Sequence, residues 1–191
     1  MKIRSALAVI ACGAAVVLLT GCAYPVKVTG GGKAVGLAQD ATGTLYENVP
    51  ATAAGQAKLT EPVPEAGGYT GNGNFQFVDH LTGMCFHAEL EFGGAYPGLL
   101  VFLDPWWVES FSDWENLAYA EGWVRDCSSG DGAYDDGYAY VWLYDAGVPG
   151  PDKGDRVVVM RDPYPYAGVL PYGYDGVLES GNYTLHAVKT K

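Results

Sequence analysis

The feature that most constrains the fold of this sequence is an alternation of apolar and polar residues across positions 74–92. Phe75 and Phe77 alternate with polar residues before the segment 79–83, and a second alternating run follows that segment. A period of two places apolar side chains on one face of a strand, and a glycine-containing break between two such runs is typical of a turn. The sequence therefore predicts a β-hairpin with one apolar face and one wet face.

Other short runs with strand character follow, separated by turns rich in Gly, Pro and Asp. The chain of 191 residues contains 27 Gly, 14 Tyr and 5 Trp, a composition that favours strands and turns over a helical bundle. We expect an all-β fold, either an antiparallel β-sandwich or a barrel-like domain. The additional strands that we expect are at 34–37, 118–125, 138–144, 156–160 and 183–188.

Two aromatic segments, near 93–117 and 162–176, look like insertions into this pattern. In the first, Asp104 is a suitable N-cap and Pro105 suits the first position of a helix. One short inserted helix is therefore expected from position 105. Its apolar face, which we expect to cover the sheet, would consist of Trp107, Phe111 and Trp114.

The N-terminus has the layout of an export signal. Lys2 and Arg4 precede an uncharged apolar run, as in a secretory signal peptide. The run ends in Leu-Thr-Gly-Cys22, which resembles the lipobox of bacterial lipoproteins. That resemblance implies that residues 1–21 are removed and that Cys22 becomes the acylated N-terminus. The alternatives are an ordinary signal peptide with a chance cysteine and an uncleaved anchor helix.

Residues 22–33 are then expected to form the lipidated N-terminus and a flexible tether, because three glycines follow one another at 30–32. Residues 34–191 would form a single β domain, with a long irregular loop in its first part. Several acyl chains hold a protein firmly on a membrane. We expect the protein on the extracytoplasmic face of the cell membrane, or in the outer membrane where the envelope has one.

The cysteine count agrees with export. With Cys12 removed and Cys22 acylated, only Cys85 and Cys127 remain in the domain. Two thiols outside the cytoplasm usually form a disulfide. A bridge that closes a loop of roughly 40 residues contributes about 4 kcal/mol in the chain-entropy treatment.

Three patches, at 75–87, 145–155 and 181–186, resemble a domain that recurs in anchored bacterial surface proteins and is sometimes labelled post-COAP. The resemblance extends over roughly residues 30–188, but the tryptophan-rich segment 104–117 and the tyrosine-rich segment 162–175 depart from it. It implies a β-sandwich-like surface module of unassigned function, and it supplies no catalytic or binding residues.

The charge is strongly acidic. The formal net charge is −11, and removing Lys2 and Arg4 takes it to −13. This balance excludes nucleic acid as a partner, because phosphate binding needs clustered Lys and Arg. Acidic loops suit calcium, although aspartates in turns more often cap backbone amides. The candidate calcium ligands are Asp126, Asp131, Asp135, Asp136, Asp145, Asp152 and Asp155.

The three histidines, His80, His87 and His186, all lie in or beside the recurring patches. Imidazole binds zinc and similar ions, so their convergence would make a metal site. No metal-binding spacing such as HxH or HExxH occurs, however, and a structural role for these histidines is the favoured interpretation.

Aromatic residues held by prolines are candidates for stacking on sugar rings or for anchoring a protein partner. Their alternative role is a lid packed on the sheet. The candidates are Trp106, Trp107, Tyr164, Tyr166, Tyr172 and Tyr174.

The sequence thus predicts a lipid-anchored cell-surface β module without catalysis, acting in envelope structure or adhesion through exposed aromatics. Its expected partners are the membrane, through the lipid, and a cell-wall glycan or a surface protein. One alternative is a carbohydrate-binding lipoprotein with calcium in its acidic loops. Another is a small extracytoplasmic hydrolase with a pair of carboxylates, although no GxSxG or SxxK motif is present.

Overall fold

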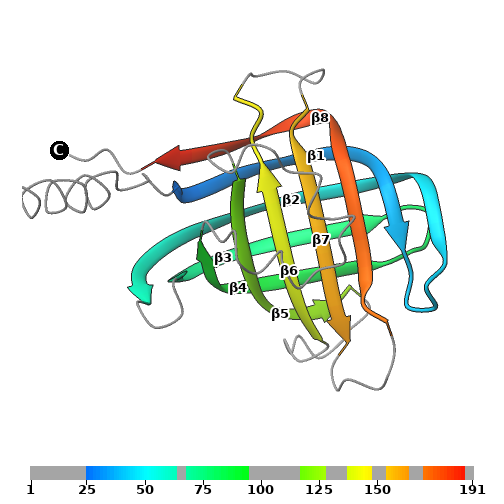
Figure 1. The fold of residues 1–191 in the computed structure, drawn as a ribbon, viewed down its shortest axis with the longest axis horizontal. Helices are drawn as coiled ribbons and strands as arrows, with labels where there is room; N and C mark the ends of the chain where they lie inside the picture. Colours follow the sequence, from blue (N-terminus) through cyan, green and yellow to red (C-terminus); the bar gives the residue numbers. More distant parts are fainter. Residues whose placement is uncertain are drawn as a thin grey trace, which may run out of the picture.

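The computed structural model describes residues 25–63, 68–94, 117–127, 137–147, 154–163 and 170–187. Eight antiparallel strands form a closed barrel, in which each strand pairs with the next and β8 pairs with β1 (Figure 1). The strands are β1 (Pro25–Gln39), β2 (Leu45–Val63), β3 (Gly68–Asp79), β4 (Cys85–Gly94), β5 (Leu117–Asp126), β6 (Gly137–Tyr144), β7 (Arg156–Pro163) and β8 (Tyr172–Ala187).

The all-β prediction is confirmed, and of the two expected architectures the barrel is the one observed. The hairpin expected at 74–92 is formed by β3 and β4, which are joined by a turn at 80–84. No α-helix occurs in the described ranges. The leader and the inserted helix expected from position 105 lie outside them.

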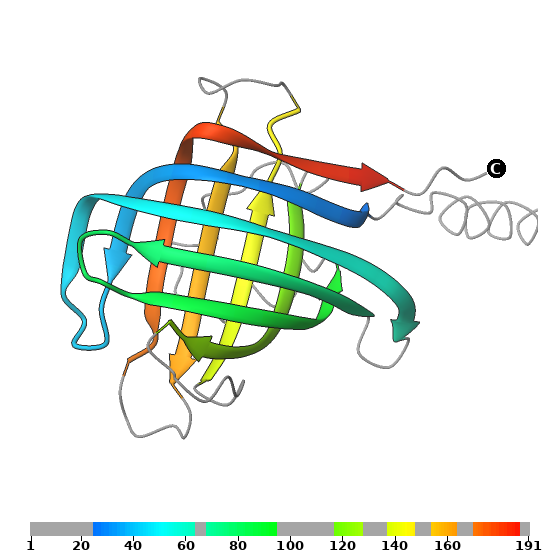
Figure 2. The same cartoon turned by 180° about the vertical axis from the view of Figure 1, so that it is seen from behind.

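Strands from the two halves of the chain cross each other steeply. Figure 2 shows β2, β3 and β4 running across β6 and β7, with β1 and β8 curving from one direction into the other. All four connections β1–β2, β3–β4, β5–β6 and β7–β8 lie at one end of the barrel. β1 begins and β8 finishes at the opposite end, where Pro25 pairs with Ala187.

The interior of the barrel is filled with side chains. Phe77 lies near its centre, with ring-centroid distances of 5.6 Å to Phe86, 5.9 Å to Tyr172 and 5.0 Å to Tyr174. Alanines and valines from every strand except β3 and β8 complete the cluster. An interior void between Phe75 and neighbouring side chains measures only about 10 Å³, which is about the space of one water molecule.

Three tyrosines of β8 point into this core, and each hydroxyl has a partner. Tyr172 donates to Asp79 Oδ2 at 2.8 Å, and Tyr174 and Tyr183 donate to backbone carbonyls of β2 at 3.2 and 3.3 Å. Burial raises the pKa of all three phenols. The hydrogen bonds are what allow these polar atoms to lie in an apolar interior.

The tether prediction is wrong from Pro25 onwards. β1 begins at Pro25, and Gly30, Gly31 and Gly32 lie within it, paired with both β2 and β8. Gly30 and Gly31 have φ values of 139° and 153°, and a Cβ on Gly32 would overlap the carbonyl oxygen of Ser180. These glycines are therefore present because the strand bends between two close neighbours, and a side chain would not fit there.

The long irregular loop expected before residue 68 is also wrong, because β2 occupies Leu45–Val63. Pro50 is accommodated within the strand opposite Val35, and its carbonyl accepts the N–H of His80 at 2.9 Å. Alternate residues from Val49 to Ala57 face the core. Their small size had obscured the strand pattern in the sequence.

Candidate functional site

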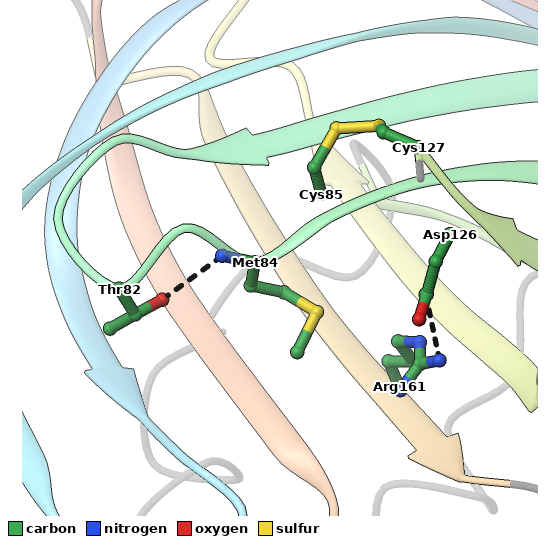
Figure 3. Close-up of a disulfide and its surroundings, with 6 residues drawn as sticks. All are labelled: Thr82, Met84, Cys85, Asp126, Cys127 and Arg161. Atoms are coloured by element: carbon green, nitrogen blue, oxygen red, sulfur yellow. Dashed lines mark hydrogen bonds and ion pairs between the residues drawn. A yellow bond between two sulfur atoms is a disulfide. The ribbon is translucent and has the colours of Figure 1, made fainter. Parts of the chain in front are cut away.

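The predicted disulfide between Cys85 and Cys127 is present, with the two Cα atoms 5.5 Å apart. It joins the start of β4 to the residue after β5, and Cys127 N–H also donates to the Cys85 carbonyl at 3.2 Å. Figure 3 shows the ion pair beside it, in which Arg161 contacts Asp126 at 2.7 Å. The bridge therefore ties β4 to the end of β5, and the neighbouring ion pair links that end of β5 to β7.

Asp79 ends β3 and is completely buried. Its carboxylate accepts hydrogen bonds from Leu81 N–H at 2.7 Å, from Thr82 N–H at 2.9 Å and from the Thr82 hydroxyl at 2.6 Å, in addition to Tyr172. The residue thus holds the β3–β4 turn and connects it to β8. This arrangement gives Asp79 a structural role in the hairpin turn.

The segments 145–155 and 181–186 contact each other. Asp155 accepts from the backbone amides of Ala146 at 2.9 Å and Tyr183 at 2.7 Å. Asp145 accepts from Gly147 at 2.7 Å and Leu185 at 3.1 Å. All four carboxylate oxygens of Asp145 and Asp155 therefore accept hydrogen bonds from backbone amides, which is the capping role that was the alternative to calcium binding.

Of the other predicted calcium ligands, the structure describes one. Asp126 is engaged with Arg161, and the remaining four lie outside the described residues: Asp131, Asp135, Asp136 and Asp152. Within the described ranges, no three carboxylate, histidine or cysteine side chains gather in a way that could hold a metal ion.

The histidines have separate surroundings. His80 Nε2 lies 2.9 Å from the Thr52 hydroxyl, and His186 Nε2 lies 3.4 Å from the Thr29 hydroxyl. His87 lies on the outer face of β4. In the part of the chain that the structure describes, they form no common metal site.

Two of the six aromatic candidates do not have the exposure that was expected of them. Tyr172 and Tyr174 are 2% and 0% exposed, because β8 begins at Tyr172 and turns both rings into the barrel. They are core residues and cannot stack on a ligand. The other four candidates, Trp106, Trp107, Tyr164 and Tyr166, lie outside the described residues.

An aromatic surface that the sequence analysis did not single out covers the outer face of β5 and β6. Tyr119 packs against Trp142 with ring centroids 5.3 Å apart, and Trp123 meets Tyr138 edge to face at 5.2 Å. Tyr119 and Trp142 are only 3% and 1% exposed, although they do not belong to the interior cluster. The alternation of aromatic with small residues in these strands was the available signal.

A groove of about 510 Å³ crosses the outer faces of β1 to β4 on the opposite half of the barrel. Its floor contains small residues, Ala54, Gly55 and Ala88, and part of Phe75. Its polar side chains are those of Thr29, Gln56, Asn74, Gln76 and His87. We take this groove as the candidate functional site, because it is concave and is lined by several polar side chains.

The strand register fixes the order of the groove residues. Thr29, Gln56 and Asn74 are directly opposite one another on β1, β2 and β3, and the same row continues to Glu89 and Trp123. Ala54, Gln76 and His87 form the neighbouring row. The alternation in the hairpin predicted its wet face, but no pattern pointed to Gln56, because the segment that forms β2 was expected to be irregular.

Comparisons with protein-family profiles, with curated proteins and with solved structures found no match to this chain. Among the described residues there is no helix with the length and hydropathy needed to span a membrane.

Proposed function

We propose that the protein is a lipid-anchored, extracytoplasmic β-barrel that acts through its outer surface, without catalysis, in envelope structure or adhesion. The observation that carries this proposal is the filled interior. Barrels that carry a small ligand inside keep a cavity for it, whereas here Phe77 and the β8 tyrosines occupy the centre. A ligand or partner of the described barrel must therefore bind outside it.

The disulfide supports the proposed location. Disulfides persist in oxidising compartments and are rare in the cytosol, and Cys85 and Cys127 are paired here. The export-type leader and the lipobox-like sequence before Cys22 agree with this location.

The start of β1 constrains how the barrel would sit on the membrane. Pro25 is three residues after Cys22, and an extended chain spans at most about 3.6 Å per residue. The lipidated residue would therefore lie within about 11 Å of the barrel, and the end at which β1 starts and β8 finishes would face the bilayer. The proposal is thus of a rigid head held close to the membrane rather than one on a long tether.

The two aromatic segments connect strands at opposite ends of the barrel. The segment 95–116 joins β4 to β5 at the end that would face the membrane, and 164–169 joins β7 to β8 at the far end. Under this proposal a partner beyond the membrane surface would meet the end of the barrel at which β7 is followed by β8.

Of the two alternative functions, carbohydrate binding is favoured by the groove on β1 to β4, whose polar residues are mostly neutral amides. The hydrolase alternative requires two carboxylates at a cleft. The buried carboxylates of the described chain, Asp79, Asp155 and Asp175, already bond to a turn, to backbone amides and to Arg156.

Metabolic labelling with an alkyne fatty acid tests the anchor. We expect the wild-type protein to be labelled and Cys22→Ser to be unlabelled, with Cys12→Ser as the matched control that remains labelled. Accessibility of the protein to a membrane-impermeant reagent on intact cells or spheroplasts tests its side of the membrane. Equal labelling of wild type and Cys22→Ser would refute the proposal. So would a protein that is protected from the impermeant reagent to the same extent as cytosolic marker proteins.

A further inference from the structure

We infer that the groove across β1 to β4 binds an uncharged oligosaccharide, and that Gln56, Asn74 and Gln76 are its hydrogen-bonding residues. The inference rests on the proposed function, because a glycan reaches this groove only if the barrel is displayed outside the cytoplasm. It assigns the ligand to a described surface, separate from the aromatic segments considered above.

The three carboxamides are available to a ligand. Gln56, Asn74 and Gln76 are all exposed, and none makes a side-chain hydrogen bond within the described part of the chain. Each carboxamide offers two N–H donors and one carbonyl acceptor. A sugar hydroxyl is both donor and acceptor, so neighbouring hydroxyls on a ring can pair with both ends of one carboxamide.

The shape of the groove comes from small residues between these amides. Ala54 is directly opposite Gln76 on one side and Gly31 on the other, so this row has no long side chain on β1 or β2. The groove volume of about 510 Å³ lies within the usual range for small-ligand sites, roughly 300–1,000 Å³. The amides thus border a hollow large enough for more than one sugar ring.

The charge of the groove argues for a neutral ligand. Eight of the nine lining residues have no ionisable side chain, and His87 is the exception. A phosphate or carboxylate ligand is normally bound by Arg or Lys, often through paired hydrogen bonds. The groove contains neither residue, so its specificity must come from neutral hydrogen bonds and from contact area.

An extended peptide is a poorer fit. Peptides commonly bind sheets by adding a strand to an exposed edge. The barrel is closed, with β8 paired to β1, so the groove lies on the face of paired strands and presents no free edge.

The register also extends the groove toward an aromatic ring. Asn74 is opposite Glu89, and Glu89 is opposite Trp123, whose ring meets Tyr138. With strands about 4.8 Å apart, Gln56 and Trp123 are separated by about 14 Å along this row. An oligosaccharide of several rings could therefore bond to the amides while one ring contacts the partly exposed indole.

The test uses the purified full-length protein in detergent and soluble tetrasaccharides as probes: chitotetraose, cellotetraose, maltotetraose and mannotetraose, with tetragalacturonate as an acidic comparison. We expect at least one neutral probe to bind by calorimetry, and tetragalacturonate not to compete. The triple variant Gln56→Ala/Asn74→Ala/Gln76→Ala should weaken binding by about tenfold or more. Ala54→Arg, which fills the hollow, should abolish it.

Asn72→Ala is the matched control, because Asn72 is an exposed asparagine of the same strand that does not line the groove. It should bind like the wild type, and all variants should keep the wild-type melting temperature. The inference is overturned if no neutral probe binds, if only the acidic probe binds, or if binding survives both groove variants. Any of these results in a protein that is still labelled at Cys22 and accessible from outside would leave the proposed surface location standing.

Discussion

The outer surface of β1 to β4 and the outer surface of β5 to β7 belong to one barrel wall but differ in chemistry. On the first, Thr52, Gln56, Asn74 and Gln76 alternate with buried apolar residues. On the second, Tyr119, Trp142 and Val158 lie outside the interior cluster and are nevertheless 3% exposed or less. A strand with one solvent-exposed face shows a regular alternation of apolar and polar residues in its sequence, whereas a strand buried on both faces does not.

This difference indicates which half of the outer surface can bind a ligand and which half mainly stabilises the fold. The polar face keeps its amides open to solvent, so it can exchange water for a ligand without losing packing. The aromatic face is already buried at Tyr119 and Trp142, so its outward residues contribute to stability in the way that core residues do. Equivalent substitutions on the two faces should therefore have different effects on the free energy of unfolding.

The largest contrast should come from Trp142→Ala set against Gln56→Ala. Loss of the buried indole should lower the free energy of unfolding by about 3–5 kcal/mol, because the residue is 1% exposed and packs on Tyr119. Gln56→Ala should change it by no more than about 0.5 kcal/mol. Urea unfolding followed by tryptophan fluorescence and circular dichroism measures both, and similar losses for the two variants would remove the distinction between the faces.

Removing the disulfide should lower the free energy of unfolding, because this bridge connects the two halves of the barrel. Cys85 begins β4 and Cys127 follows β5, with a sequence separation of 42, so the bridge ties the polar half to the aromatic half. The double variant Cys85→Ala/Cys127→Ala should lose about 4 kcal/mol, mainly because the unfolded chain is no longer constrained. Unfolding of the wild type with and without reductant is the control, and a loss below about 1 kcal/mol would contradict the prediction.

Two tyrosines allow a sharper comparison of the outer and inner surfaces. The Tyr119 hydroxyl is buried and has no hydrogen-bond partner among the described residues, so Tyr119→Phe should leave stability unchanged or raise it by up to about 1 kcal/mol. The Tyr172 hydroxyl donates to buried Asp79, so Tyr172→Phe should cost about 1–3 kcal/mol. Thermal unfolding of the two variants measures both changes in stability. A larger loss for Tyr119→Phe than for Tyr172→Phe would contradict the environments assigned to the two hydroxyls.

The smallest effect concerns Glu121, on the aromatic face. Burial raises the pKa of this carboxyl above its ordinary value of 4.5, partly offset by the hydrogen bond from Tyr138. The folded state therefore favours the protonated form, and stability should fall as the pH rises from about 4.5 through the raised folded-state pKa. Glu121→Gln should remove this fall and stabilise the protein at neutral pH, by less than about 1 kcal/mol because the group is partly exposed.

Melting temperatures between pH 4 and pH 8 measure this difference. Glu89→Gln is the matched control, since Glu89 is an exposed glutamate of the polar half. A Glu121→Gln variant whose advantage is the same at pH 4 and pH 7 would show that titration of the carboxyl is not its cause.

Several elements could be predicted because their signal is local. The hairpin of β3 and β4 follows from the alternation around Phe77 and Phe86, and the pairing of Cys85 with Cys127 follows from the cysteine count. β1 and β2 could not be predicted in the same way, because the glycines at 30–32 and the alanines of β2 weaken both strand propensity and the apolar pattern. Their strand conformation depends on neighbours that are distant in the sequence, such as Ser180 beside Gly32.

The candidate site was only partly predictable for a related reason. Asn74, Gln76 and His87 lie on the wet face that the hairpin pattern defined. Gln56 and Thr29 reach the same groove only through the register of β2 with β1 and β3. The role of Asp155 was likewise hidden, because its partner Tyr183 is 28 residues away.

The sequence by itself determined that this chain is built from antiparallel strands, where one hairpin turns and which two cysteines are joined, since period and cysteine count are local properties. Only the tertiary structure decided which face of each strand is inside. β6 turns Ala139, Val141 and Leu143 inward and its aromatic residues outward, whereas β8 turns Tyr172, Tyr174 and Tyr183 inward. The physical reason is volume: the closed barrel has a fixed space to fill at native density, so large side chains from one strand require small ones from those facing it.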